Sequence, residues 1–294
     1  MKEIASAEFD AVVSEAGREW VIMSGLERSI FNKISRHKAL KDWDIKINYG
    51  IKTGYNEAFI IDEETKDMLI KEDKKSAEII KPLLRGRDID KYIYHNNGLY
   101  LINTHNGVKE SNIKPIDVNK YKAIKKHLDK YYSQLEKRGD KGITPYNLRN
   151  CAYLEEFDKP KIVWKQTSKY QTFMLDTEGY YITVSAHMLT IKDNDINKLK
   201  YILSILNSNL FKYYMLSVAT NFSGVGIRWL PAFIENVPIP EASSKNFNKI
   251  IKLVDDITEL KKQDKDTTPL EKNIDEIVYS LYGLNDEEVK VVEG

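Results

Sequence analysis

Few residues of this sequence have types and spacing that match a catalytic site. Two Glu-x-Lys triplets, Glu64–Lys66 and Glu288–Lys290, combine the carboxylate and the lysine with which nucleases hold a divalent ion and a water molecule. Neither triplet follows a Pro-Asp pair, and such triplets arise by chance in a chain with 45 basic and 44 acidic residues. A magnesium-dependent nuclease with an unrecognised site remains one alternative for the function of this chain.

Other catalytic and cofactor motifs are missing. Gly224 and Gly226 lack the third glycine of a dinucleotide or S-adenosylmethionine cradle, and neither a phosphate-binding loop nor a nucleophile elbow occurs. The five histidines fall at no metal-ligand spacing, and the single cysteine, Cys151, rules out an internal disulfide and a cysteine-rich zinc site. No two prolines are adjacent, so the loop with which amino-group methyltransferases grip a flipped adenine is absent. We therefore expect no catalytic residue, no metal and no cofactor in this chain.

The apolar pattern predicts the helices and strands that position the polar side chains. Helical spacing predicts a lead-in helix within residues 1–30 and further helices over 117–138 and about 196–216. Strand-like runs occur at 43–61, where a turn at 53–56 predicts a hairpin, and at 92–102, 161–164, 172–175, 180–184 and 188–191. Two apolar stripes, at 247–260 and 270–281, predict an antiparallel helix pair.

These elements predict an α+β fold, with a mixed α/β body and a C-terminal antiparallel helical pair. We expect a lead-in from an upstream domain over residues 1–30, a body over 31–240 and a helical tail over 245–294. No apolar run is long enough to span a bilayer, and no secretory signal precedes the body. The expected location is cytoplasmic, with no membrane partner.

The net charge of +1 conceals an uneven distribution. Residues 120–170 contain 13 Lys and Arg against 6 Asp and Glu, whereas residues 241–294 contain 8 against 13. The basic middle segment is consistent with a surface that faces phosphates, although solvated lysines and AT-rich coding sequence also explain it.

Seven segments in a fixed order resemble the TaqI-like specificity region, the C-terminal half of type IIG restriction enzymes and related adenine-specific DNA methyltransferases. The segments are Tyr49–Asp62, Ile80–Ile89, Thr144–Tyr153, Lys161–Trp164, Ile205–Ser208, Val237–Pro240 and Ile274–Leu284. Each segment alone is weakly specific, but the ordered set covers roughly residues 40–290. The chain is therefore identified as similar to this family.

The resemblance implies that the body is a DNA target-recognition domain that binds double-stranded DNA. In the family, the methyltransferase domain and often a nuclease domain precede this region, so S-adenosylmethionine and magnesium are expected only in catalytic domains that this chain lacks. The chain is then a fragment, or a subunit that acts with a separate methyltransferase or nuclease. A type I-like specificity subunit, whose long helix spaces and docks domains, is a further alternative.

The resemblance also implies that polar loop residues contact DNA, because Arg, Lys, Asn and Gln can read base edges in the major groove. The candidates are Lys52, Thr53, Asn56, Arg85, Arg87, Tyr146, Asn147, Arg149, Asn150, Lys165, Gln166, Lys169, Asn221 and Arg228. The loop after Trp164 is the better candidate for base choice, whereas the motif at 144–153 suits backbone positioning.

Structural roles compete with DNA contact at several of these positions. Thr53 belongs to a turn, and Arg85 and Arg87 could pair with Asp88 or Asp90 to fix their loop. Arg228 could stack on a packed Trp229. The apolar stripes of the tail could be buried within the chain itself.

Overall fold

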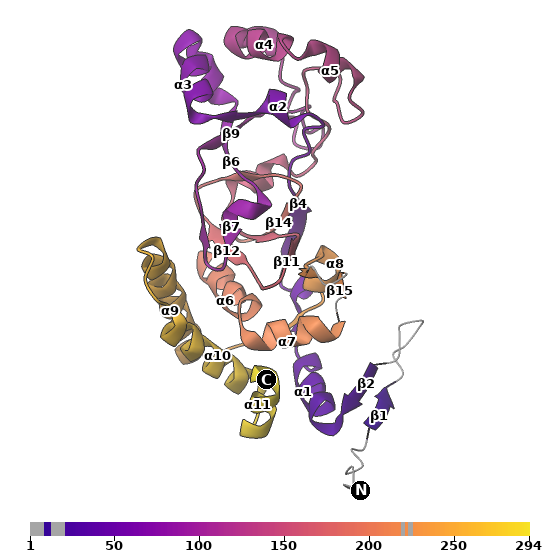
Figure 1. Cartoon of the computed structure of the whole chain (residues 1–294), viewed down its shortest axis with the longest axis vertical. Coiled ribbons are helices and arrows are strands. Elements are labelled where there is room, and N and C mark those ends of the chain that lie inside the picture. The colour runs from indigo at the N-terminus through magenta and orange to yellow at the C-terminus, as the bar shows by residue number, and fades with distance from the viewer. Residues whose placement is uncertain (1–8, 13–20, 219–220, 223–225) are drawn as a thin grey trace, which may run out of the picture.

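A four-stranded antiparallel sheet lies in the middle of the molecule and separates two hydrophobic cores (Figure 1). The computed structural model describes residues 9–12, 21–218, 221–222 and 226–294. The strands of this central sheet, in spatial order, are β12 (Phe173–Asp176), β10 (Lys161–Lys165), β14 (Ala186–Ile191) and β4 (Ile45–Tyr49).

Successive side chains of the central strands enter opposite cores, because side chains alternate between the two faces of a sheet. Val163 of β10 lies opposite Met174 and Met188, and all three belong to the core on the side of the cleft described below, here named the cleft-side core. Trp164, the next residue, lies opposite Phe173, and both belong to the other core, named the tail-side core. A sheet buried on both faces explains why β10 and β14 are mostly apolar and do not alternate between apolar and polar residues.

A second sheet builds most of the cleft-side core. Its spatial order is β13 (Tyr181–Ile182), β6 (Ile80–Leu84), β9 (Leu99–Ile102) and β5 (Ile60–Asp62), with β13 parallel to β6. The helices at this end of the molecule are α2 (Asn56–Phe59), α3 (Glu63–Glu72), α4 (Lys122–Asp129) and α5 (Tyr132–Lys137) (Figure 1).

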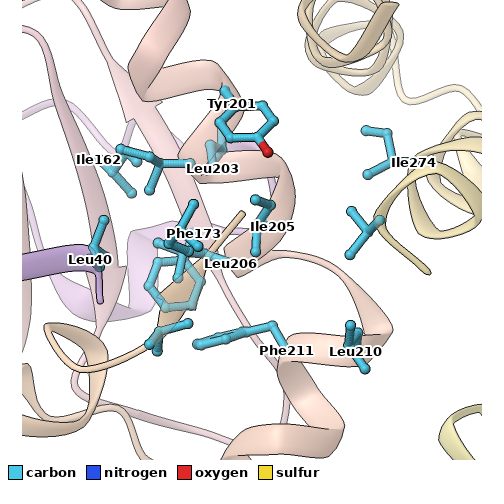
Figure 2. Close-up of a cluster of buried hydrophobic side chains, with 14 of the residues drawn as sticks. Leu40, Ile162, Phe173, Tyr201, Leu203, Ile205, Leu206, Leu210, Phe211 and Ile274 are labelled. Carbon is cyan, nitrogen blue, oxygen red and sulfur yellow. The ribbon is translucent and has the colours of Figure 1, made fainter. Parts of the chain in front are cut away.

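Helices build the tail-side core against the opposite face of the central sheet. They are α6 (Ile196–Leu206), α7 (Asn209–Val218), α9 (Ser244–Lys262), α10 (Thr268–Tyr282) and α11 (Asp286–Glu293). Figure 2 shows Ile162 and Phe173 of the sheet beside Leu203 and Leu206 of α6, with Phe211 of α7 nearby. The apolar stripes of α9 and α10 belong to this core, so the chain itself buries them.

Residues near the two ends of the chain are joined through Glu288. Helix α1 (Gly25–Ser35) packs on α11, where Glu288 accepts hydrogen bonds from Ser29 at 2.7 Å and Lys33 at 2.6 Å. The Asn285 amide donates to the same carboxylate at 2.8 Å. Glu288 is 1% exposed, which assigns this member of a Glu-x-Lys triplet a structural contact.

Short elements complete the described part of the chain. Three pairs of short strands occur: β1 (Phe9–Val12) with β2 (Val21–Ser24), β3 (Lys38–Ala39) with β17 (Pro238–Ile239), and β7 (Ile89–Asp90) with β8 (Ile93–Tyr94). A small three-stranded sheet has the spatial order β11 (Thr167–Ser168), β16 (Gly226–Arg228) and β15 (Asn221–Phe222). The remaining helices are α8 (Pro231–Ile234) and 3-10 turns at Leu40–Asp42, Lys74–Glu78, Gly86–Asp88, Val118–Lys120 and Leu154–Asp158.

The α+β fold is confirmed, and three local predictions are wrong. Strands β4 and β5 do not form a hairpin with each other, because β4 pairs with β14, β5 pairs with β9, and α2 lies between them. The helix predicted over 117–138 is divided into a 3-10 turn, α4 and α5. The one predicted over 196–216 is interrupted between α6 and α7, where the Asn207 side chain accepts from and donates to the Phe173 backbone.

The lead-in helix predicted within residues 1–30 is also corrected. Residues 9–12 and 21–24 are paired strands, and the helix begins only at Gly25, after the capping residue Ser24. Residues 1–8 and 13–20 lie outside the described part of the chain. No helix of the described residues is long and apolar enough to cross a membrane. The domain boundaries at residues 31, 240 and 245 stay predictions.

Candidate nucleic-acid interface

Five of the predicted DNA-contact residues line one open cleft of about 810 Å³. It is lined by the segments 51–57 and 85–87, here named its walls, and by the loop 183–185, here named its floor. The five predicted residues that line it are Lys52, Thr53, Asn56, Arg85 and Arg87. Two segments that resembled family motifs therefore face each other across a single concave surface.

Glycines let both walls approach the floor closely. A Cβ atom on Gly50 would lie 2.0 Å from the Thr183 carbonyl oxygen, and one on Gly86 would lie 2.6 Å from that of Ser185. The Gly86 amide also donates to the Ser185 hydroxyl at 2.9 Å. Contact between backbones at this distance requires glycine, which explains the glycine in each motif.

The two arginines beside Gly86 have different roles. Arg85 donates from Nε and Nη2 to the two oxygens of Asp88 at 2.9 and 2.8 Å, and Asp88 is 2% exposed. Burial raises the pKa of Asp88, but the hydrogen bonds and charge of Arg85, together with a hydrogen bond from Asn97, outweigh burial and lower it, so the carboxylate is ionised. Arg87 is exposed and has no ion-pair partner among the described residues. Arg85 thus fixes the loop, and Arg87 is the cation available to a ligand.

A buried arginine supports the wall formed by 51–57. Arg138 donates to the carbonyl oxygens of Thr53, Pro145 and Asn147, and its guanidinium lies 4.5 Å from the centre of the Phe59 ring. Burial lowers the pKa of Arg138 to about 10. This one side chain joins the cleft wall to the loop that carries the 144–153 motif.

Two residues of the first candidate segment have different exposure. Thr53 is 4% exposed, and its hydroxyl donates to Asn56 at 2.6 Å, so Thr53 has the alternative, structural role. Asn56 and Lys52 are exposed at the cleft. Lys52 forms an ion pair of 2.8 Å with Asp140, from the loop that Arg138 anchors.

The motif at 144–150 is mostly structural. Asn147 is 1% exposed, and its side-chain amide donates to the Ile116 carbonyl at 2.9 Å, which gives this side chain a structural contact, and DNA contact by Asn147 stays a prediction. The Tyr146 hydroxyl donates to Asp129, which leaves only part of its ring accessible. Arg149 and Asn150 are exposed, so for them DNA contact stays a prediction.

The loop after Trp164 joins the cleft through Ser185. The backbone amide of Gln166 donates to the backbone carbonyl of Ser185 at 3.0 Å. The backbone carbonyl of Gln166 accepts from the backbone amide of Trp229, also at 3.0 Å. Lys165 and Gln166 are half-buried and Lys169 is exposed. The predicted base-reading loop therefore continues the surface of the cleft.

Two anchors hold this loop, one at Ser168 and one at Gln171. Trp229 is buried, as the alternative interpretation expected, and its Nε1 donates to the Ser168 hydroxyl at 2.8 Å. Gln171 is also buried and donates to the carbonyls of Asn207 and Ser208 at the end of α6. Between the anchors, the ring of Tyr170 is left 63% exposed.

The last candidate segment is only partly described. Arg228 is exposed on β16, where it lies opposite Thr167 of the base-reading loop. Asn221 belongs to β15, but its side chain lies outside the described part of the chain, as does Ser223. DNA contact by Asn221 and Arg228 stays a prediction.

Sequence reasoning missed the residues that assemble this surface. Arg138 was not recognised because it lies in a run of charged residues. Ser185 was not recognised because it lies in a loop between predicted strands. Tyr170 was not recognised because the other residues of its loop are polar. Its neighbour Lys169 was singled out, and an aromatic residue inside a predicted recognition loop was the available signal.

The donor set of the cleft does not fit a divalent metal. Mg²⁺ prefers carboxylate oxygens, and the cleft lining contains one carboxylate, Glu57, against Lys52, Arg85 and Arg87. In the described part of the chain, no group of three or more His, Cys, Asp or Glu residues could hold a metal ion. The cationic lining suits an anion such as a phosphate instead.

Comparisons with known proteins place the sequence in a family. The family model for the TaqI-like C-terminal specificity domain matches residues 81–239. The type II methyltransferase M.MjaIV of Methanocaldococcus jannaschii is 25% identical over 252 residues, which are 85% of this chain and 82% of that protein. The type II methyltransferase M.BstVI of Geobacillus stearothermophilus is 21% identical over 285 residues, 95% of this chain but 47% of that protein.

One solved structure of a restriction–modification enzyme shares the fold, and a second is less similar. The type IIL enzyme MmeI, in complex with DNA, superposes with a TM-score of 0.60 at 12% identity, over 83% of this chain and 34% of that chain. The type IIG endonuclease BpuSI superposes with a TM-score of 0.48 at 15% identity, over 90% of this chain and 36% of that chain. This chain thus spans about a third of each solved chain and about half of M.BstVI. The family model covers more than half of the sequence, and the chain belongs to the TaqI-like C-terminal specificity domains.

Proposed function

We propose that this chain recognises a short sequence of double-stranded DNA as the specificity part of a type II restriction–modification enzyme. The observation that carries the proposal is the surface assembled around Ser185, in a member of a specificity-domain family. It brings together cationic and amide side chains from the segments 52–56, 85–87 and 165–169. Such side chains bind phosphates and read base edges.

The proposal divides the surface between backbone contact and base reading. Lys52 and Arg87 lie on the exposed walls of the cleft and would pair with phosphates on either side of a groove. Gln166 and Lys169 lie on a loop that is anchored at Ser168 and Gln171, and this loop would present their polar atoms to base edges. Tyr170 would add an apolar contact to the same bases.

The proposed partner is an adenine-specific methyltransferase or a nuclease, either on a separate chain or in another part of a longer one. Both curated relatives are named as type II methyltransferases. Under this proposal S-adenosylmethionine and Mg²⁺ bind in that catalytic part, whose chemistry they supply. The residues of the cleft bind and orient the DNA.

Selection from random duplexes tests the function. The purified chain is immobilised, duplexes with a random central region are passed over it, and the retained duplexes are sequenced. One enriched short motif is expected. When unselected duplex is added as a competitor, it should displace a duplex with this motif less readily than it displaces a duplex without the motif. Retention without any enriched motif would contradict sequence recognition by this chain.

A further inference from the structure

One carboxylate holds two of the cations that the sequence predicts to contact DNA, Lys52 and Arg149. Asp140 pairs with Lys52 at 2.8 Å and with Arg149 at 3.3 Å, although these residues come from segments far apart in the sequence. Both cations are otherwise well placed for a ligand, with side chains 51% and 54% exposed. In the described structure, the two cations therefore share an internal counter-ion.

The backbone of the Asp140 loop is fixed against the cleft wall. Gly54, which has a positive φ of 72°, packs so closely on this loop that an added Cβ would lie 3.0 Å from Asp140 Cβ. Arg138 donates to the Thr53 carbonyl, and its Cδ would lie 3.4 Å from the same added Cβ. The backbone that carries Asp140 is therefore packed against the wall that carries Lys52.

The charge of Asp140 is maintained by its partners. The hydrogen bond from Lys52 lowers the pKa of Asp140, and the positive charges of Arg149 and Arg138 act in the same direction. An ionised carboxylate at this position attracts the same cations as a DNA phosphate and repels that phosphate. Phosphate and carboxylate therefore compete for Lys52 and Arg149.

We propose that Asp140 is a built-in competitor for DNA phosphates, which holds Lys52 and Arg149 and weakens binding to every duplex by the same factor. This inference rests on the proposed function. A uniform decrease in affinity leaves the ratio between the affinities for matched and unmatched sites unchanged. It also shortens the time that the protein spends on unmatched DNA, where phosphate contacts supply essentially all of the affinity.

The test compares Asp140→Asn with Asp193→Asn in binding titrations against a labelled duplex over a range of salt concentrations. Asparagine keeps the Cβ that packs on Gly54 and removes only the charge. Asp193 forms an ion pair of 2.5 Å with Lys198 beyond the end of β14 that is remote from Ser185, so its substitution changes the net charge equally. Thermal unfolding of each variant verifies that the fold is retained.

Asp140→Asn should bind matched and unmatched duplex about threefold or more tightly than wild type, whereas Asp193→Asn should not. The slope of log affinity against log salt should become more negative by about 0.9 for each cation that gains a phosphate. The gain should disappear when Lys52→Met and Arg149→Met are added, because the released cations are then absent.

Two results would overturn the inference while leaving the proposed function intact. Equal affinity of Asp140→Asn and Asp193→Asn would show that the carboxylate does not compete with DNA. Weaker binding by Asp140→Asn than by wild type would show that Asp140 orients the two cations toward DNA. If neither wild type nor Asp140→Asn bound any duplex, the proposed function and the inference would both fail.

Discussion

The amide of Gly86 donates to the hydroxyl of Ser185 at 2.9 Å, and this contact joins two segments of the candidate interface. The backbone carbonyl of the same serine accepts from Gln166 at 3.0 Å. The loop that presents Arg87 and the loop that presents Lys169 are therefore held by one residue. The relative position of these two side chains depends on how closely Gly86 and Ser185 approach.

Replacing Gly86 with alanine should separate these loops. The added Cβ would lie 2.6 Å from the Ser185 carbonyl oxygen, so backbone must shift, and we expect the free energy of unfolding to fall by about 1–3 kcal/mol. Urea denaturation measures this change, and the titration against duplex should show weaker binding. Gly139→Ala is the control, because an added Cβ there has no atom within 4 Å. Equal stability of the two variants would disprove the close contact.

Removing Arg87 should weaken DNA binding without affecting the fold. The Arg87 side chain is exposed at the cleft, so we expect Arg87→Ala to unfold like wild type and to bind all duplexes more weakly. The slope of log affinity against log salt concentration should become less negative by about 0.9. Lys192→Ala removes the same charge from an exposed position beyond the far end of β14. Binding losses of the same size in both variants would indicate a general effect of net charge and would contradict a role for the cleft.

Removing Arg138 should destabilise the cleft wall. Arg138→Met would leave the carbonyls of Thr53, Pro145 and Asn147 without their buried donor, and we expect a loss of about 3 kcal/mol in the free energy of unfolding. Lys137→Met changes an exposed neighbour and should be close to neutral. A similar stability for both variants would mean that Arg138 does not support the wall.

His187 should make stability depend on pH. Its ring is 0% exposed, neither ring nitrogen has a hydrogen-bond partner among the described residues, and burial lowers the pKa of His187 to about 4. The unfolded chain binds a proton at this histidine below its ordinary pKa of 6.5, and the folded chain does not until about 4. The stabilising contribution of the neutral His187 ring to the free energy of unfolding is therefore complete above pH 6.5 and is lost as the pH falls toward 4.

The difference between wild type and His187→Leu isolates this effect from other titrating groups. Between about pH 7.5 and about pH 5, wild type should lose about 2 kcal/mol more of its free energy of unfolding than His187→Leu does. The exposed His95 provides the control, since His95→Leu should follow wild type. Parallel pH profiles for wild type and His187→Leu would contradict burial of the neutral ring.

Local sequence patterns predicted the strands of the central sheet and the tail helices but not the pairing of strands. The runs at 161–164 and 188–191 are mostly apolar because both faces of β10 and β14 are buried. The turn at 53–56 has hairpin residue types, yet β4 pairs with a strand more than a hundred residues later. Pairing between distant strands depends on the global fold, which local spacing does not encode.

The candidate site was predictable as a set of segments and not as a set of side chains. The motifs named the walls of the cleft, and the structure brings them together at Ser185. Asparagine has the same polar head in a buried and in an exposed place, so sequence alone did not distinguish the structural Asn147 from the exposed Asn150. Asp140, which pairs with two of the predicted cations, was not singled out because its partners lie in other segments.

Amide hydrogen exchange of the chain with its selected duplex tests the central claim most directly. We expect the duplex to slow exchange in the segments 51–57, 85–87, 165–171 and 183–185, and a duplex of scrambled sequence at the same concentration to slow it less. Protection of the outer surface of α9 and α10 instead, or equal protection by both duplexes, would contradict the claim that this cleft and its adjoining loop recognise a DNA sequence.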